Sequence, residues 1–228
     1  MSTSILVSRL SLFAALGLGL AGCGNDPDIS ANRATIGKTV SAILGRGDAA
    51  AAPAATLEQQ AAQALASGDA AVLVASKELG GDGVLIQIAE NGDYDHFGNA
   101  RREVMTFRHG VLTNTRGLGN DLMSSDIAES LALIRGRRAG TAERRMRYLD
   151  GEDKTFTYTF RCTVSVGGSE SYSSGRISTG VTTVTEECSA ASRNFRNTYK
   201  VDGSGEVVAS RQWMAPLHGT FAFSLLRR

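Results

Sequence analysis

The chain has 228 residues, with 24 Lys plus Arg against 23 Asp plus Glu, so its formal net charge is +1 at pH 7. This balance gives no long-range attraction toward a polyanion and argues against a nucleic-acid partner. The length is sufficient for a sizeable hydrophobic core.

Residues 1–22 show the three parts of a secretory signal peptide. Arg9 is the only charged residue, an apolar stretch runs from Leu10 to Leu20, and small residues lead to Cys23. Because a membrane-spanning helix needs about 20 apolar residues, this shorter stretch predicts a cleaved signal. Leu20-Ala21-Gly22-Cys23 has the form of a bacterial lipobox and predicts lipidation, including palmitate, at Cys23.

Lipidation at Cys23 implies a durable membrane anchor, since bacterial lipoproteins carry several acyl chains. Gly24 follows the cysteine in place of Asp, which favours the outer membrane and its periplasmic face. The alternative is an ordinary signal peptide with a chance cysteine. We expect a signal peptide over 1–22, a lipidated, Ala-rich tether over 23–55 with a weakly amphipathic helix at 31–44, and a single β-rich domain over 56–228.

The next elements are short. Leu57–Ala66 has the pattern of a helix, with Thr56 and Gln59 placed for a capping box. After it, apolar runs separated by glycine-containing turns predict strands. The predicted strands are 71–76, 84–89, 102–107 and 111–114, with turns at 80–83, 91–93 and His109-Gly110.

Arg116–Leu122 contains two glycines followed by Asn120 and Asp121. One interpretation is a ligand loop in which Arg116, Asn120 and Asp121 contact a ligand or partner. The other is structural, with glycines at positive φ and Asp and Asn bonding to the local backbone. The motif is not a phosphate loop, because no Gly-Lys-Ser/Thr ending follows it.

A helix is predicted over Ile127–Ile134, and six arginines follow it closely. Export argues against an RNA-binding role, and the other interpretations are an anionic sugar polymer, lipid headgroups, or a solvated face. We favour a solvated face with local ion pairs. The arginines are Arg135, Arg137, Arg138, Arg144, Arg145 and Arg147, and the acidic partners are Glu143, Asp150, Glu152 and Asp153.

The C-terminal half alternates apolar and polar residues with period two, which is typical of half-buried strands. Thr155–Val166 alternates over twelve residues, and 167–176 is interpreted as a Ser/Gly loop. The alternation of Ile177–Cys188 changes phase near Thr182-Thr183, which predicts a bulge. Further alternating runs to the end of the chain predict a mainly β fold: a coiled antiparallel meander sheet with a few short helices near the N-terminus and mid-chain.

Cys162 and Cys188 remain as a pair in an oxidising compartment once Cys23 is lipidated, and they predict a disulfide. Two buried thiols are the alternative. A metal site is not expected, since there is no Cys-x-x-Cys and the three histidines are scattered. A hairpin symmetric about 167–176 would pair Cys162 with Val181. A disulfide therefore requires either an asymmetric register or a Cys188 that has left the ladder.

Seven segments together resemble the YjbF-type lipoproteins, which are related to the group 4 capsule lipoprotein GfcB. The likeness runs from about residue 57 to the end, in addition to the lipobox. The segments are the lipobox ending in Cys23; Gly110–Leu112 with Thr115–Leu122; Arg147–Gly151; Phe160–Cys162; Glu187-Cys188; Phe195–Tyr199; and Ser210–Pro216.

The resemblance implies an outer-membrane lipoprotein linked to exopolysaccharide or capsule production, with a mainly β fold. It carries no catalytic residues to this chain. We expect a non-enzymatic accessory factor that contacts an outer-membrane polysaccharide export protein, the polymer, or both. Besides the loop residues, Arg211, Gln212 and Trp213 are candidate contacts, because sugar sites combine aromatic faces with polar groups. Trp213 as a core residue is the structural alternative.

Two other functions remain open. The first is a periplasmic protein-binding module or chaperone for an outer-membrane export protein, acting through exposed strand edges. The second is a polysaccharide-modifying enzyme. Glycoside hydrolysis needs two carboxylates at a set separation, and the spacing of the acidic residues singles out no pair. No Gly-x-Ser-x-Gly elbow is present. We therefore expect no catalytic residues, no metal and no cofactor.

Overall fold

The computed structural model describes residues 55–228, apart from 69, 78–81, 150–151 and 153. The predicted signal peptide, Cys23, the predicted helix at 31–44 and almost all of the tether lie outside the described residues. Asp150 and Asp153, expected as ion-pair partners, also lie outside them. Among the helices of the described part, none is long and apolar enough to cross a bilayer.

The helix α2 spans Leu57–Ala66, as predicted. Its N-terminus has the expected capping box: the Gln59 backbone N–H donates to Thr56 Oγ1 at 3.2 Å, and the Thr56 N–H donates to Gln59 Oε1 at 2.9 Å. At the other end, Arg227 Nη1 donates to the Leu65 carbonyl at 3.0 Å. The last strand of the chain thus holds the C-terminus of the first described helix.

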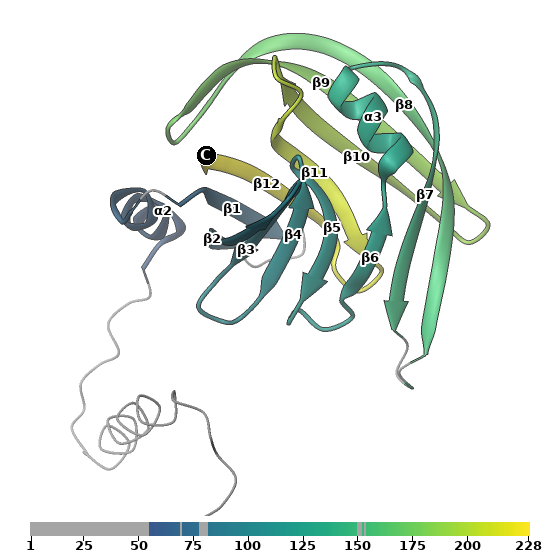
Figure 1. Cartoon of the computed structure of the whole chain (residues 1–228), viewed down its shortest axis with the longest axis horizontal. Coiled ribbons are helices and arrows are strands. Elements are labelled where there is room, and N and C mark those ends of the chain that lie inside the picture. The colour runs from purple at the N-terminus through teal and green to yellow at the C-terminus, as the bar shows by residue number, and fades with distance from the viewer. Residues whose placement is uncertain (1–54, 69, 78–81, 150–151, 153) are drawn as a thin grey trace, which may run out of the picture. The chain divides into compact units, whose positions relative to one another are not determined.

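Twelve antiparallel strands form one nearly closed, barrel-like sheet, which confirms the mainly β prediction (Figure 1). Strands that follow each other in the chain pair with each other, except β5 and β6, and β1 also pairs with β12. The ring is therefore open only between β5 and β6. The strands are β1 Val72–Lys77, β2 Asp82–Asn91, β3 Tyr94–Gly98, β4 Val104–Arg108, β5 Val111–Arg116, β6 Leu122–Asp126, β7 Gly140–Leu149, β8 Thr155–Ser174, β9 Ile177–Ala190, β10 Arg193–Asp202, β11 Val207–Ala215 and β12 Gly219–Arg227.

The predicted Ser/Gly loop at 167–176 is wrong: β8 continues through it, and the hairpin turns at Gly175-Arg176. A Cβ at Gly175, where φ is +55°, would lie 2.6 Å from the Leu226 carbonyl oxygen. Contact with β12 therefore decides which glycine makes the turn. In Figure 1, β8 and β9 form the long arch at the top of the view.

A turn at Gly175-Arg176 also sets the register in which the two cysteines pair. Cys162 and Cys188 are direct partners in the β8–β9 ladder, and their disulfide confirms the prediction. The expected bulge is present at the expected place, but its extra residue lies in β8, where Gly167 and Gly168 face Thr183. The register is thus symmetric about a later turn, apart from this one insertion.

The sequence pattern does not predict the strands β3, β6 and β7. The interpretation of the six arginines as a solvated face is wrong for Arg144. Arg144 lies in the inward phase of β7 and is fully buried. Because a charge occupies this buried position, the sequence of β7 does not show apolar alternation. Its neighbour Arg145 faces outward and pairs with Glu143, as expected of a solvated face.

The two ends of the barrel-like sheet differ. The helix α3, Ala128–Gly136, connects β6 to β7 and packs across one end against apolar residues of β5 and β8–β11 (Figure 1). Since consecutive strands are antiparallel, the end of β1, the start of β2 and the β3–β4, β5–β6 and β11–β12 connections all lie at the other end. We call this end the mouth.

Candidate functional site

The β5–β6 connection at the mouth is built around one carboxylate. Asp121 accepts hydrogen bonds from Thr115 Oγ1 at 2.9 Å, the Gly117 N–H at 2.9 Å and the Leu118 N–H at 3.2 Å. Gly117 has a φ of +84°, and a Cβ there would lie 2.8 Å from the Arg102 carbonyl oxygen. Asp121 therefore fixes the shape of the loop, the role given by the structural interpretation of this motif.

Side chains, rather than a backbone ladder, bridge the opening between β5 and β6. Asn114 Nδ2 donates to the Met123 carbonyl at 2.6 Å, and the Leu122 N–H donates to Thr115 Oγ1 at 3.0 Å. Farther along β5, the Leu112 N–H donates to Gln212 Oε1 at 2.8 Å. These bonds satisfy edge groups that would otherwise be open to another strand.

A buried polar cluster lies inside the sheet, on the side of α3. Arg144 Nη1 lies 2.9 Å from Glu186 Oε2, and Nη2 of the same guanidinium donates to the Leu112 carbonyl at 3.2 Å. Tyr199 Oη and Asn197 Nδ2 also donate to Glu186, at 2.8 and 2.9 Å. Burial alone would raise the pKa of Glu186, but Arg144 and these donors hold it below the usual value.

This cluster is enclosed, and its hydrogen bonds link strands to one another. Among the described residues, one group of His, Cys, Asp or Glu has the geometry for a metal ion: Cys162, Glu186 and Cys188. Both sulfurs are joined in the disulfide, and a metal requires thiolates. The group therefore does not suit a metal.

The three candidate contact residues of β11 differ in burial. Gln212 is fully buried, and its Nε2 donates to the Gly110 carbonyl at 2.8 Å. Trp213 is 8% exposed and stacks on Phe195 with ring centroids 4.8 Å apart. Arg211 faces outward. The structure thus places Gln212 and Trp213 in the core, the structural alternative for Trp213.

The candidates of the β5–β6 loop lie nearer the surface. Arg116 is exposed and its guanidinium contacts Met123 Sδ, whereas Asn120 is half-buried at a φ of +47°. Leu118, between them in sequence, packs against the same core cluster that contains Trp213. The loop and Trp213 therefore belong to one end of the barrel-like sheet, but Trp213 offers little surface there.

A cleft of about 370 Å³ opens at the mouth. Strand ends and connections from both halves of the chain line it, with an apolar floor and a polar rim. This volume is within the roughly 300–1,000 Å³ of small-molecule sites, and barrel mouths are common places for them. We call it the mouth cleft; its lining is Ala75, Lys77, Asp82, Gly83, Leu85, Asn99, Arg101, Glu103, Met105, Leu118, His218 and Phe221.

Two networks hold the rim. Glu103 Oε2 accepts from Asn99 Nδ2 at 2.6 Å and from Arg101 Nε and Nη2 at 3.0 and 2.9 Å. Burial raises the pKa of Glu103, but the Asn99 and Arg101 hydrogen bonds outweigh it and leave the pKa lowered. Across the cleft, Lys77 Nζ lies 3.2 Å from His218 Nδ1. His218 Nε2 contacts the Gly119 carbonyl, which ties the β11–β12 connection to the β5–β6 loop.

The His218 contacts fix its tautomer. A lysine ammonium only donates and a carbonyl only accepts, so Nδ1 carries the lone pair and Nε2 carries the proton. His218 is therefore neutral in this arrangement. In the described part of the chain, no carboxylate lies within ion-pair distance of the Lys77 ammonium, and Asp82, which starts the neighbouring strand opposite Ser76, has no described side-chain hydrogen bond.

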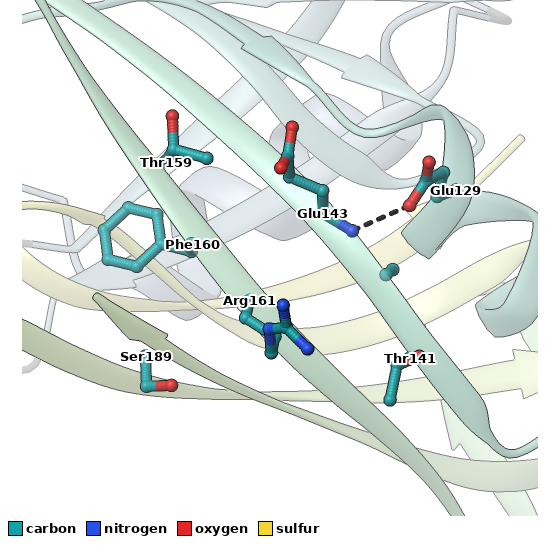
Figure 2. A pocket seen from close by; sticks show the side chains of 8 residues that line it. Glu129, Thr141, Glu143, Thr159, Phe160, Arg161 and Ser189 are labelled. Carbon is teal, nitrogen blue, oxygen red and sulfur yellow. Dashed lines mark hydrogen bonds between the residues drawn. The ribbon is translucent and has the colours of Figure 1, made fainter. Parts of the chain in front are cut away.

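A second hollow, of about 410 Å³, lies on the outer face of β7 and β8 beside α3 (Figure 2). Its two carboxylates are engaged: Glu129 Oε2 accepts from the Glu143 backbone N–H at 2.8 Å, and Glu143 pairs with Arg145. Figure 2 shows Thr159 and Arg161 on the neighbouring strand.

The sequence analysis did not identify the residues of the mouth cleft. They come from several strand ends and connections that no local motif links. The available signal is topological: in a closed meander, alternate connections meet at one end. This signal can be read only once β1 is known to pair with β12, because that pairing joins the first and last described strands.

Both the sequence and the fold resemble those of known proteins. The profile of the family described as "Group 4 capsule polysaccharide lipoprotein gfcB, YjbF" matches residues 37–226. The crystal structure of the hypothetical lipoprotein YmcC from Escherichia coli (K12) is similar, with a TM-score of 0.65 and 16% sequence identity over 75% of this chain and 91% of that chain. At this identity the structural likeness shows the fold alone. No curated protein matches the sequence.

Proposed function

The chain belongs to the group 4 capsule polysaccharide lipoprotein family, and on this premise we propose that it is a lipid-anchored, non-enzymatic accessory factor in producing or exporting a capsule or exopolysaccharide. The match of the family profile to residues 37–226 is the observation that carries the proposal. Its partners are an outer-membrane polysaccharide export protein, the polymer, or both.

The anchor is lipidated Cys23, and the place of action is the periplasmic face of the outer membrane. The lipobox and Gly24 support this placement. Residues 24–54 separate the lipid from the domain that begins near Thr56.

A non-enzymatic role is supported by three described carboxylates whose oxygens are engaged within the fold. Asp121 holds its own loop, Glu129 caps a backbone N–H, and Glu186 is enclosed with Arg144. A general acid or base must instead reach a substrate proton. A direct test is to incubate the purified full-length protein with the polymer. We expect the polymer's size distribution and composition to stay unchanged, and a change in either would contradict the proposal.

The accessory role is tested in the strain that carries the gene. Deleting the gene should lower the amount of polymer at the cell surface, and the intact gene should restore it. Cys23→Ser should release the protein from the membrane fraction and leave surface polymer as low as in the deletion strain. Ser30→Ala, in the same tether, is the matched control and should behave as the intact protein.

Gly24→Asp tests the membrane assignment separately. Because Asp after the lipidated cysteine favours the inner membrane, this variant should be lipidated but retained there. Unchanged surface polymer in the deletion strain would overturn the accessory role. A Cys23→Ser protein that stays in the outer membrane would overturn the anchor.

A further inference from the structure

We propose that the mouth cleft binds one or two uncharged sugar rings of the polymer through their hydroxyl groups. This inference rests on the proposed function and adds to it a site and a ligand class. It selects direct contact with the polymer over contact with the export protein alone. The argument follows from the floor, the rim and the charge of the cleft.

The floor of the cleft is apolar, while the polar groups stand at its rim. Leu85, Met105 and Phe221 close the floor as buried members of the main core cluster, and half-buried Leu118, which packs against this cluster, presents apolar surface to the cleft. Such a surface suits the C–H face of a pyranose ring, whose hydroxyls then point toward the rim. Recognition of this kind combines apolar contact with a few fixed polar groups.

The rim supplies hydrogen-bond donors. Lys77 has three ammonium protons, and only the contact to His218 Nδ1 uses one of them among the described residues. Arg101 and Asn99 lie on the same side as the start of β2: a Cβ on Gly83 would lie 3.8 Å from Arg101 Nη2 and 4.0 Å from Asn99 Nδ2. The absence of a side chain at Gly83 thus keeps these groups close to the cleft.

The rim also supplies acceptors. Glu103 Oε2 takes all the described hydrogen bonds of that carboxylate, which leaves Oε1 available. Asp82, at the start of β2, offers a second carboxylate with no described side-chain partner. A sugar hydroxyl donates and accepts at once, so a rim that holds both donors and acceptors suits a polyol.

The charges of the rim decide between an uncharged and an acidic sugar. Among the described lining residues, Lys77 and Arg101 contribute two positive charges, Asp82 and Glu103 contribute two negative charges, and the contacts of His218 use the neutral form of its ring. A carboxylate-bearing ring would gain from Lys77 but would meet Asp82 and Glu103 in the same small space. A balanced rim of this kind favours uncharged rings.

The site is also preorganised. The contact of His218 with Gly119 and the bonds of Asn99 and Arg101 to Glu103 hold the rim before any ligand arrives. Groups already fixed lose little side-chain entropy on binding. We therefore expect the free and bound cleft to have similar shapes.

The test is titration calorimetry of the full-length protein in detergent with short oligosaccharides. These are released from the exopolysaccharide of the gene's own strain by mild acid and separated into neutral and acidic fractions. Saturable binding of the neutral fraction is expected. Asp82→Asn, Lys77→Gln and Glu103→Gln should each weaken binding about tenfold, the effect of losing one hydrogen bond to a charged group. Per-O-methylation of the oligosaccharide should abolish binding.

The matched controls are Glu90→Gln, at the far end of the strand that begins with Asp82, and Lys200→Gln on β10. Both should bind as the unaltered protein does. Thermal unfolding followed by circular dichroism must show each variant folded. Asp82→Asn is the most telling variant, because this side chain holds no described structural hydrogen bond.

Three outcomes would overturn the inference: no binding of the neutral fraction, tighter binding of the acidic fraction, or equal loss of affinity in the control variants. These outcomes are distinct from failure of the accessory role. If gene deletion lowers surface polymer but the purified protein binds no oligosaccharide, the cleft assignment fails and the accessory role stands. If deletion leaves surface polymer unchanged, the accessory role itself fails.

Discussion

Arg144 on β7 and Glu186 on β9 form a fully buried ion pair, with Nη1 and Oε2 2.9 Å apart. The same guanidinium donates to the Leu112 carbonyl on β5, across the opening of the sheet. One charged pair therefore links the β7–β9 side of the sheet to the free edge of β5. Removing one partner would leave the other charged, buried and unpaired.

Arg144→Met should therefore lower the free energy of unfolding by about 3–5 kcal/mol. Chemical denaturation monitored by circular dichroism measures this quantity. Arg145→Met is the neighbouring control: its exposed pair with Glu143 is expected to contribute about 1 kcal/mol or less. Similar losses for the two variants would mean that the buried pair is not a special source of stability.

Tyr148 and Tyr199 give a prediction at high pH. Burial raises the pKa of both phenols far above the usual value, and for Tyr199 the charge of Glu186 adds to the increase. An unfolded tyrosine ionises near pH 10. The unfolded chain therefore loses these protons first, and the free energy of unfolding should fall as the pH rises above about 10, with no such loss below it.

This predicts that phenolate absorbance from the two buried tyrosines appears together with loss of the folded circular dichroism signal. Tyr148→Phe should remove one tyrosine equivalent from that step. Ionisation of all five tyrosines while the protein remains folded would contradict the prediction.

The disulfide between Cys162 and Cys188 joins strands across a sequence separation of 26 residues. By the chain-entropy estimate, replacing both cysteines with alanine should lower the free energy of unfolding by about 3–4 kcal/mol. Denaturation of the unaltered protein with reductant should reproduce the value for the variant. Free thiols at these positions, detected by mass spectrometry after alkylation without reductant, would exclude the bond.

Asp121 is expected to keep the β5–β6 loop in place at the mouth. Asp121→Ala removes acceptors from the Gly117 and Leu118 N–H groups and should cost about 1–3 kcal/mol. Hydrogen exchange should show faster exchange at these two amides, with little change in α3. Glu90→Ala provides a comparison with a carboxylate outside the loop, and unchanged exchange in Asp121→Ala would contradict the assigned role.

Local signals predicted much of the fold. The capping box at Thr56 and Gln59 acts within one turn, and the turn at His109-Gly110 has both residues at positive φ. The alternation of Thr155–Val166 reports the two faces of one strand. Each of these features depends on residues close in sequence, so the structure reproduces them.

The candidate site was less predictable. Asp121 and its glycines are recognisable as a loop, but the rim of the mouth cleft needs Lys77 to lie beside His218, 141 residues away. Arg144 was interpreted as solvated because arginine is rarely buried without a partner. Its partner, Glu186, lies 42 residues along the chain.

The sequence by itself determined the β class, the helix cap, the pairing of the two cysteines and the family. The β class follows from periodicity, the cap from local hydrogen bonding, and the cysteine pairing from the two cysteines that remain in an exported chain, whereas the family follows from the resemblance of several sequence segments. Only the tertiary structure decided that Gly175 makes the β8–β9 turn, that Arg144 is inside, and that distant connections meet around the mouth cleft. The reason is that β1 pairs with β12, and the resulting closure sets contacts between residues that no local pattern relates.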